Sequence, residues 1–266
     1  MHDHDGGLQF DVSTLMTRRR ALQLVAVGGL AAVVGCGSSS DGSAGSAATA
    51  TSGGAGAGAT PEVPEETAGP FPADGSNGVN VLTESGIVRS DLTSSFGSAA
   101  AVAEGVPLTI ALTVLDVAAG GTPVEGAAVY LWHCDREGRY SLYDPALASE
   151  NYLRGVQASG GDGALSFTSI WPGAYSGRWP HIHFEVYPSL GEATSAGAKL
   201  VTSQIALPED ACREVYASAG YEQSAANLTG ASLASDMVFA DGYSTQLATA
   251  TGAPADGMTI TLNVGV

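Results

Sequence analysis

The sequence predicts an all-β protein, a single β-sandwich domain with long loops and one short helix, preceded by an export signal and a disordered linker. Short runs rich in Val, Ile, Leu and Thr recur along the chain, with turn residues between them, which is typical of strands. Only Pro208–Ala217 combines acids in a first turn with apolar residues spaced by three to four, the pattern of a helix. No internal repeat is evident, so one sandwich accounts for the folded part.

The first 35 residues predict a twin-arginine lipoprotein signal. Thr17–Gln23 reads TRRRALQ, and the apolar run Leu24–Gly35 leads into Cys36 through the sequence VVGC. Because this run is only about a dozen residues long, it is too short to span a bilayer. We expect residues 1–35 to be removed, Cys36 to be lipidated, and the protein to be exported to the cell envelope or beyond it. Translation from Met16 instead of Met1 stays open.

Residues 36–61 predict a flexible linker. They are almost entirely Gly, Ser, Ala and Thr from residue 37 to residue 60, a composition that cannot bury enough apolar surface to fold. The remaining residues, 62–266, are numerous enough for one substantial core and need no division into two domains.

Six segments of this domain predict strands. They alternate apolar and polar residues: Leu108–Val117, Ala127–His133, Ala164–Ile170, His181–Tyr187, Leu200–Ala206 and Met258–Val264. Gly, Ser and Ala between Asp91 and Glu104, and again between Glu222 and Asp256, predict long loops. Tyr216 and Tyr221, near the expected helix, are interpreted as packing residues.

The charge excludes some partners. The chain has 27 acidic residues against 10 basic ones, a formal net charge of −17, and Lys199 is its only lysine. Such a surface repels nucleic acid and anionic lipid, so contact with a membrane is expected only through the acyl group.

A histidine pair predicts half of a metal site. In a strand, side chains alternate between faces, so His181 and His183 point the same way while Ile182 and Phe184 face a core. A loop, GAYSGR, precedes the pair and can bring Tyr175 back to the same point. The alternative is a histidine pair that only forms hydrogen bonds to its neighbours.

A second tyrosine, Tyr140, follows a strand and the turn DREG. Since a free phenol is protonated at neutral pH, tyrosine ligands require a strong Lewis acid such as iron(III), whereas zinc prefers Cys, His and carboxylates. Iron(III) with two tyrosinates, two neutral imidazoles and one hydroxide has a net charge of zero, so it can be buried.

Several motifs together resemble the intradiol ring-cleavage dioxygenases, specifically exported single-domain members related to the protocatechuate 3,4-dioxygenase beta subunit. The motifs, spread over about Pro64 to Val266, are ETAGPFPADGSNG, GIVRSDL, WHCDREGRYS, LRGVQ, WPGAYSGRWPHIHF and TSQIALPED. The resemblance implies a non-haem Fe(III) enzyme that cleaves catechol-type rings between the two hydroxyls with O2, giving cis,cis-muconate-type products.

The resemblance also assigns roles to residues. The metal ligands fall on Tyr140, Tyr175, His181 and His183. Tyr175 would leave the metal when substrate binds, and Arg178 and Gln204 would be catalytic residues beside it. A structural ion pair with an acidic neighbour is the alternative for Arg178.

Arg136, Arg139 and Arg154 could offset the charge of a carboxylated catechol, but the sequence does not select a ring substituent.

The cysteines have separate interpretations. If Cys36 carries the lipid, Cys134 and Cys212 remain in an oxidising compartment, where a disulfide between them is a candidate. The alternative is two thiols, one buried and one exposed. As an iron ligand Cys134 is disfavoured, because a thiolate is a soft ligand for ferric iron.

Two other functions compete with the enzyme. A cell-surface β-sandwich binding module with a vestigial metal site would share the fold, tether and charge. A zinc or copper hydrolase using His181 and His183 is weaker, since the sequence has no HExxH motif. The number of subunits is not predicted.

Overall fold

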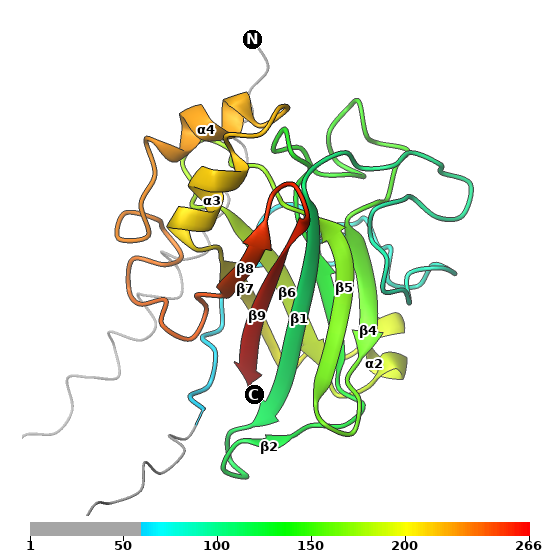
Figure 1. Ribbon diagram of the computed structural model, residues 1–266. Helices are drawn as coiled ribbons and strands as arrows, with labels where there is room; N and C mark the ends of the chain where they lie inside the picture. Colours follow the sequence, from blue (N-terminus) through cyan, green and yellow to red (C-terminus); the bar gives the residue numbers. More distant parts are fainter. Residues whose placement is uncertain (1–59) are drawn as a thin grey trace, which may run out of the picture.

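Two β-sheets packed face to face make up the protein in the computed structural model, which describes residues 60–266 (Figure 1). The first sheet contains β1 (Pro107–Asp116), β2 (Thr122–Pro123), β5 (Ala164–Ile170), β8 (Thr249–Ala253) and β9 (Gly257–Gly265). The second has the order β4 (Arg154–Ala158), β3 (Ala128–Trp132), β6 (His181–Tyr187) and β7 (Val201–Ala206). All pairings are antiparallel except that of β1 with β9, which is parallel.

The main core lies between the two sheets. In β1, buried and more exposed residues alternate, and its inward side chains from Leu108 to Val114 join one cluster with those of β6, among them Ile182 and Phe184. Because the strand period is two, the other residues of β6 point away from this core. The predicted β-sandwich is therefore confirmed.

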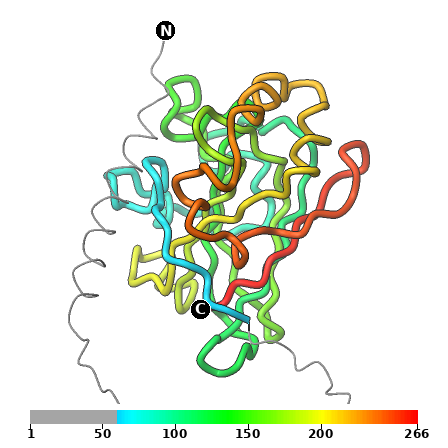
Figure 2. The backbone as a smooth tube through the Cα atoms, turned by 90° about the vertical axis from the view of Figure 1, so that its left-hand side faces the viewer, coloured from blue at the N-terminus to red at the C-terminus, as the bar shows by residue number. Residues whose placement is uncertain are grey.

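The second sheet also has a covered outer face. Every residue of β3, β6 and β7 is buried. A second apolar cluster, which includes Tyr130, Trp132 and Tyr187, covers this face together with residues from the segment 68–87. Figure 2 shows this segment, in cyan, on the side of the molecule opposite the red β8–β9 hairpin.

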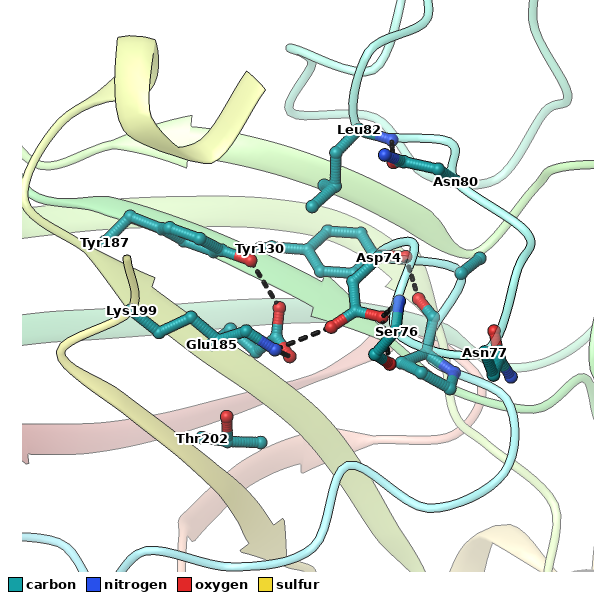
Figure 3. A network of polar contacts seen from close by, with 12 residues as sticks. Asp74, Ser76, Asn77, Asn80, Leu82, Tyr130, Glu185, Tyr187, Lys199 and Thr202 are labelled. Atoms are coloured by element: carbon teal, nitrogen blue, oxygen red, sulfur yellow. Dashed lines mark hydrogen bonds and ion pairs between the residues drawn. The ribbon is translucent and has the colours of Figure 1, made fainter. Parts of the chain in front are cut away.

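Polar contacts attach this segment to the sheet (Figure 3). Lys199 Nζ lies 2.6 Å from Asp74 Oδ2 and 2.5 Å from Glu185 Oε1, and Tyr187 donates to Glu185 at 2.7 Å. Tyr130 Oη donates to the backbone carbonyl of Pro72 at 2.7 Å. The lysine thus offsets part of the charge of two buried carboxylates and holds the segment against β6.

Several predicted elements agree with the structure. The predicted bounds of β5 and β6 are those observed, and the predicted helix contains α3 (Glu209–Val215). The prediction of a single helix is wrong, since the described part also has α2 (Leu190–Thr194) and α4 (Glu222–Leu228). Both are short, and α4 and β8 lie in a region of Gly, Ser and Ala whose composition resembles a loop. Strands β2 and β4 were also absent from the prediction.

One end of the sandwich collects the segments that matter for the site. His181, the first residue of β6, pairs with Ala206, the last residue of β7, and α3 follows at that end (Figure 1). No helix in the described range, residues 60–266, is long and apolar enough to cross a membrane. The predicted signal, Cys36 and nearly all of the predicted linker lie outside the described residues.

Candidate metal centre

Strand β6 places both histidines on the outer face of the second sheet. His181 and His183 are each 3% exposed, while Ile182 between them packs in the core on the other face. The His183 ring stacks on Trp132, its cross-strand partner, with centroids 4.9 Å apart and planes within 6°. The predicted common orientation of the two imidazoles is therefore present, and the stacking fixes that of His183.

Loops bring both tyrosines to these histidines. Ring centroids are separated by 5.6 Å for Tyr175 and His181, 4.7 Å for His181 and His183, 6.2 Å for His183 and Tyr140, and 6.1 Å for Tyr140 and Tyr175. Tyr140 is 4% exposed, whereas Tyr175 is half-buried beside exposed residues 176 and 177. The four residues expected as ligands therefore form one compact group.

The hydrogen bonds indicate where the lone pairs of this group lie. His181 Nδ1 is 2.5 Å from the carbonyl oxygen of Trp179, which can only accept, so Nδ1 carries the proton. In the neutral ring, Nε2 then presents a lone pair, and it lies 3.0 Å from Tyr175 Oη and 3.1 Å from His183 Nε2. Tyr140 Oη is buried without a hydrogen-bond partner, as is His183 Nδ1.

Burial controls the protonation of His181, His183 and Tyr140. It lowers the pKa of His181 and of His183 well below 6.5, and the charge of Arg178 acts in the same direction. Burial, followed by the neighbouring Tyr175 phenol, raises the pKa of Tyr140 well above 10. The imidazoles are thus neutral, and the Tyr140 phenol stays protonated unless a bound cation lowers its pKa.

This donor set fits a hard trivalent ion. His181 Nε2 lies within 3.1 Å of both Tyr175 Oη and His183 Nε2, and the Tyr140 ring packs against the rings of Tyr175 and His183. The buried Tyr140 oxygen, which has no hydrogen bond, is the kind of polar atom that a ligand would satisfy. Among residues 60–266, no three His, Cys, Asp or Glu side chains are grouped to hold a metal. The quartet has two histidines and two tyrosines, which is the composition expected for iron(III).

Arg178 is buried next to this quartet, and its guanidinium is held by two acceptors. Nε lies 3.0 Å from Asp236 Oδ2, and Nη2 donates to Gln204 Oε1 at 2.7 Å. The Gln204 amide in turn donates to the Thr67 carbonyl at 2.9 Å. Arg178 therefore forms the ion pair that was the alternative to a catalytic role. Its partner carboxylate, Asp236, is buried, with 3% of its surface exposed. Sequence reasoning missed Asp236, because it lies in a Ser- and Ala-rich loop without a motif.

A second carboxyl group that the sequence did not single out lies in the same region. Glu66 is 6% exposed, and burial, then the charge of Asp241, raises its pKa to about 8. A hydrogen bond with Gln246 acts in the opposite direction and lowers the pKa, as expected when an amide N–H donates to a carboxylate.

The other three arginines considered for substrate are already engaged. Arg136 pairs with Glu104 and Glu137, and Arg139 pairs with Asp135 and Glu137. Arg154 is completely buried and donates to five acceptors: the carbonyls of Phe71, Pro72 and Ser141 and the hydroxyls of Ser141 and Tyr130. Arg154 therefore attaches the 68–87 segment to the sheet.

The candidate disulfide is wrong. Cys134 and Cys212 are both free and both buried. Cys134 belongs to the cluster on the outer face of the second sheet and donates to the Gly173 carbonyl at 3.4 Å, whereas Cys212 belongs to the core between the sheets. The alternative of two free thiols is confirmed, but its expectation that one of them is exposed is wrong. Tyr216 and Tyr221 are packing residues in the core, as expected.

Sequence comparison finds similarity in the central part of the domain. A family model described as Dioxygenase matches residues 89–193, a range that includes all four residues of the quartet and Arg178. Chlorocatechol 1,2-dioxygenase of Rhodococcus opacus is 42% identical over 55 residues, 21% of either chain. Catechol 1,2-dioxygenase 1 of Acinetobacter lwoffii is 30% identical over 109 residues, 34% of this chain and 33% of that protein. The matches thus span at most about a third of these relatives.

Solved structures share the fold. An intradiol ring-cleavage dioxygenase from Tetranychus urticae superposes with a TM-score of 0.56 at 23% identity, over 68% of this chain and 87% of that one. The dioxygenase domain of a dioxygenase carbohydrate-binding fusion from Streptomyces gives a TM-score of 0.50 at 21% identity, over 77% and 98%. At this identity the likeness is one of architecture.

Proposed function

We propose that this domain is an intradiol ring-cleavage dioxygenase, a non-haem iron(III) enzyme acting on catechol-type compounds, and its similarity to the Dioxygenase model over residues 89–193 and to a catechol 1,2-dioxygenase supports this. It would cleave the ring bond between the two hydroxyl-bearing carbons, incorporate both atoms of O2 and release cis,cis-muconate-type products. The observation that carries this proposal is the convergence of Tyr140, Tyr175, His181 and His183, with a lone pair directed inward and a buried phenol oxygen without a partner.

The two tyrosines would have different roles because their surroundings differ. Tyr140 is enclosed and would stay bound to the metal throughout. Tyr175 is half-buried on a loop and would move away when a catechol binds. On leaving, its phenolate oxygen would accept a proton from one substrate hydroxyl, so that the charge around the metal is unchanged.

The remaining groups would assist without binding the metal. When bound, ferric iron supplies the Lewis acidity that withdraws electrons from the catecholate ring and makes the ring reactive toward dioxygen. Arg178 would stabilise the negative charge that develops on the substrate, because its cation is already oriented in a buried site. Gln204 would hold the Nη2 edge of that guanidinium through Oε1.

Charge favours a catechol without a carboxylate on the ring. Arg136, Arg139 and Arg154 are paired or engaged, and Arg178 is assigned to the charge that develops at the reacting centre. A substrate carboxylate would have to be desolvated without a new cation among these residues. We therefore expect catechol and its alkyl or methoxy derivatives to be cleaved with a higher kcat/KM than protocatechuate.

The place of action is also part of this proposal. The twin-arginine pattern and Cys36 support export and attachment through a lipid, which would leave the domain at the cell envelope or released from it. The twin-arginine route carries folded proteins, which suits a protein loaded with iron before export. Radiolabelled palmitate incorporated by the wild-type chain but not by Cys36→Ser would support it.

Iron content, colour and product identity test the activity. The purified full chain should hold about one iron, absorb visible light through tyrosinate bound to iron(III), and consume O2 with catechol to give a muconate-type diacid. Tyr175→Phe should reduce kcat by at least about a hundredfold because the departing ligand is lost. Tyr152→Phe, another buried tyrosine, is the matched control and should retain both colour and turnover.

A wild-type chain that cannot be loaded with iron and leaves catechol and O2 unconsumed would refute the enzyme. That result would favour the alternative function, a cell-surface binding module with a vestigial metal site. Cleavage beside the two hydroxyls, instead of between them, would refute the proposed reaction while keeping the metal.

A further inference from the structure

The loop that follows α4 provides a buried carboxylate to Arg178. Asp236 is 58 residues away along the chain, yet its Oδ2 lies 3.0 Å from Arg178 Nε and its Oδ1 lies 3.4 Å from Nη2. Both side chains are only 1% exposed. Burying a guanidinium without a counter-charge is costly, so this carboxylate stabilises the arginine in its buried position.

Asp236 is itself held by backbone donors. Oδ2 accepts from the Trp179 amide at 2.6 Å, and Oδ1 accepts from the amides of Val238 at 2.9 Å and Phe239 at 3.3 Å. Together with Arg178, these amides bind both carboxylate oxygens and fix the orientation of the side chain. It therefore connects the loop after α4 to the residues just before His181.

Two acceptors fix one edge of the guanidinium. Asp236 binds Nε and Nη2, and Gln204 Oε1 accepts from Nη2 at 2.7 Å while its amide is anchored to Thr67. Arginine has many rotamers, and orienting its donors before reaction removes an entropic cost from the chemical step. Glu66 and Asp241 are the further carboxyl groups of this region.

On this basis, and resting on the proposed function, we propose that Asp236 is a positioning residue that holds the Arg178 guanidinium beside the iron ligands. Asp236 acts through Arg178 and touches neither substrate nor metal. The Ser- and Ala-rich loop after α4 is thus part of the active site, although it contributes no ligand.

A double-mutant cycle in kcat tests the coupling. Asp236→Asn should lower kcat by about ten- to a hundredfold with a change in KM below about threefold, and should keep the iron content and visible spectrum of wild type. In an Arg178→Gln background, the same substitution should change kcat by less than about twofold, because the group it positions is already gone.

A measurement without iron gives a second readout. In the metal-free protein, the Nε–H resonance of Arg178 should be protected from exchange with water and should lose that protection in Asp236→Asn. Asp74→Asn is the matched control, because Asp74 is also buried, ion-paired and bonded to a backbone amide. It should leave the Arg178 resonance and kcat at their wild-type values.

Three results would overturn the inference. The effects of Asp236→Asn and Arg178→Gln on kcat could multiply independently, Asp236→Asn could lose its iron, or Asp236→Asn could leave kcat unchanged. If Asp236→Asn does not fold, Asp236→Glu replaces it in the cycle, since it keeps the charge and displaces the carboxylate by one methylene. A wild-type chain without iron or ring cleavage refutes the proposed function instead, and the metal-free resonance still decides whether Asp236 holds Arg178.

Discussion

Replacement of Glu66 by Gln should remove a large pH dependence of stability. Burial raises the pKa of Glu66 to about 8, so the folded protein keeps a proton that an unfolded carboxyl, with its ordinary pKa of 4.5, has released. The folded state binds more protons between these two values, so the free energy of unfolding falls as pH rises through this window. The contribution is fully present below pH 4.5 and is lost above about pH 8.

The size of this effect follows from the two pKa values. From pH 5 to about pH 8, each pH unit costs about 1.4 kcal/mol, so wild type should lose about 4 kcal/mol relative to Glu66→Gln. Gln keeps the shape of the protonated acid and has no proton to release in this pH range. The variant should therefore be the more stable protein at pH 9.

Urea unfolding between pH 5 and pH 9, followed by tryptophan fluorescence, measures this difference. The three tryptophans of the chain are all buried, so unfolding changes their emission. Chelator-treated protein is used because iron binding depends on pH by itself. Glu125→Gln, which removes an exposed carboxyl, controls for the change in net charge. An equal stability difference between wild type and Glu66→Gln at pH 5 and pH 9 would refute the reasoning.

Three further predictions concern packing and charge. Gly173→Ala should destabilise the protein by about 2 kcal/mol or more in denaturant unfolding, because a Cβ there would lie 2.5 Å from a backbone carbonyl oxygen, whereas Gly230→Ala, with 3.7 Å of room, should not. Cys134 and Cys212 should react with a thiol reagent only after the protein is unfolded, and no reducing agent should be needed. If the unfolded chain reacts slowly until a reductant is added, the two thiols are not free. Lys199→Met should cost about 2 to 4 kcal/mol, because it leaves the two buried carboxylates of Figure 3 without their cation, and the loss should appear as faster proteolysis of the 68–87 segment. An unchanged rate would show that the lysine does not hold that segment.

Local pattern was sufficient where a signal has a short period. The alternation of His181, Ile182 and His183 determines which side chains share a face, and the same alternation predicted the bounds of β5 and β6. The order of motifs then predicted which tyrosines join the histidines, and their rings do lie together. Segments without such a period, α4 and β8 among them, are predicted as loops because their propensity for regular structure is weak. In the structure, packing against the rest of the domain compensates for this weak propensity.

The sequence by itself determined six of the nine strands of residues 60–266, the common face of the two histidines and the donor types, because these depend on neighbours a few residues apart. Only the tertiary structure decided that Asp236 pairs with Arg178, that Glu66 is buried beside Gln246, and that two free cysteines belong to different apolar clusters. The first two of these contacts join residues that are far apart in the sequence. They arise from the packing of whole sheets and loops, whose free energy is spread over the chain and leaves no local motif.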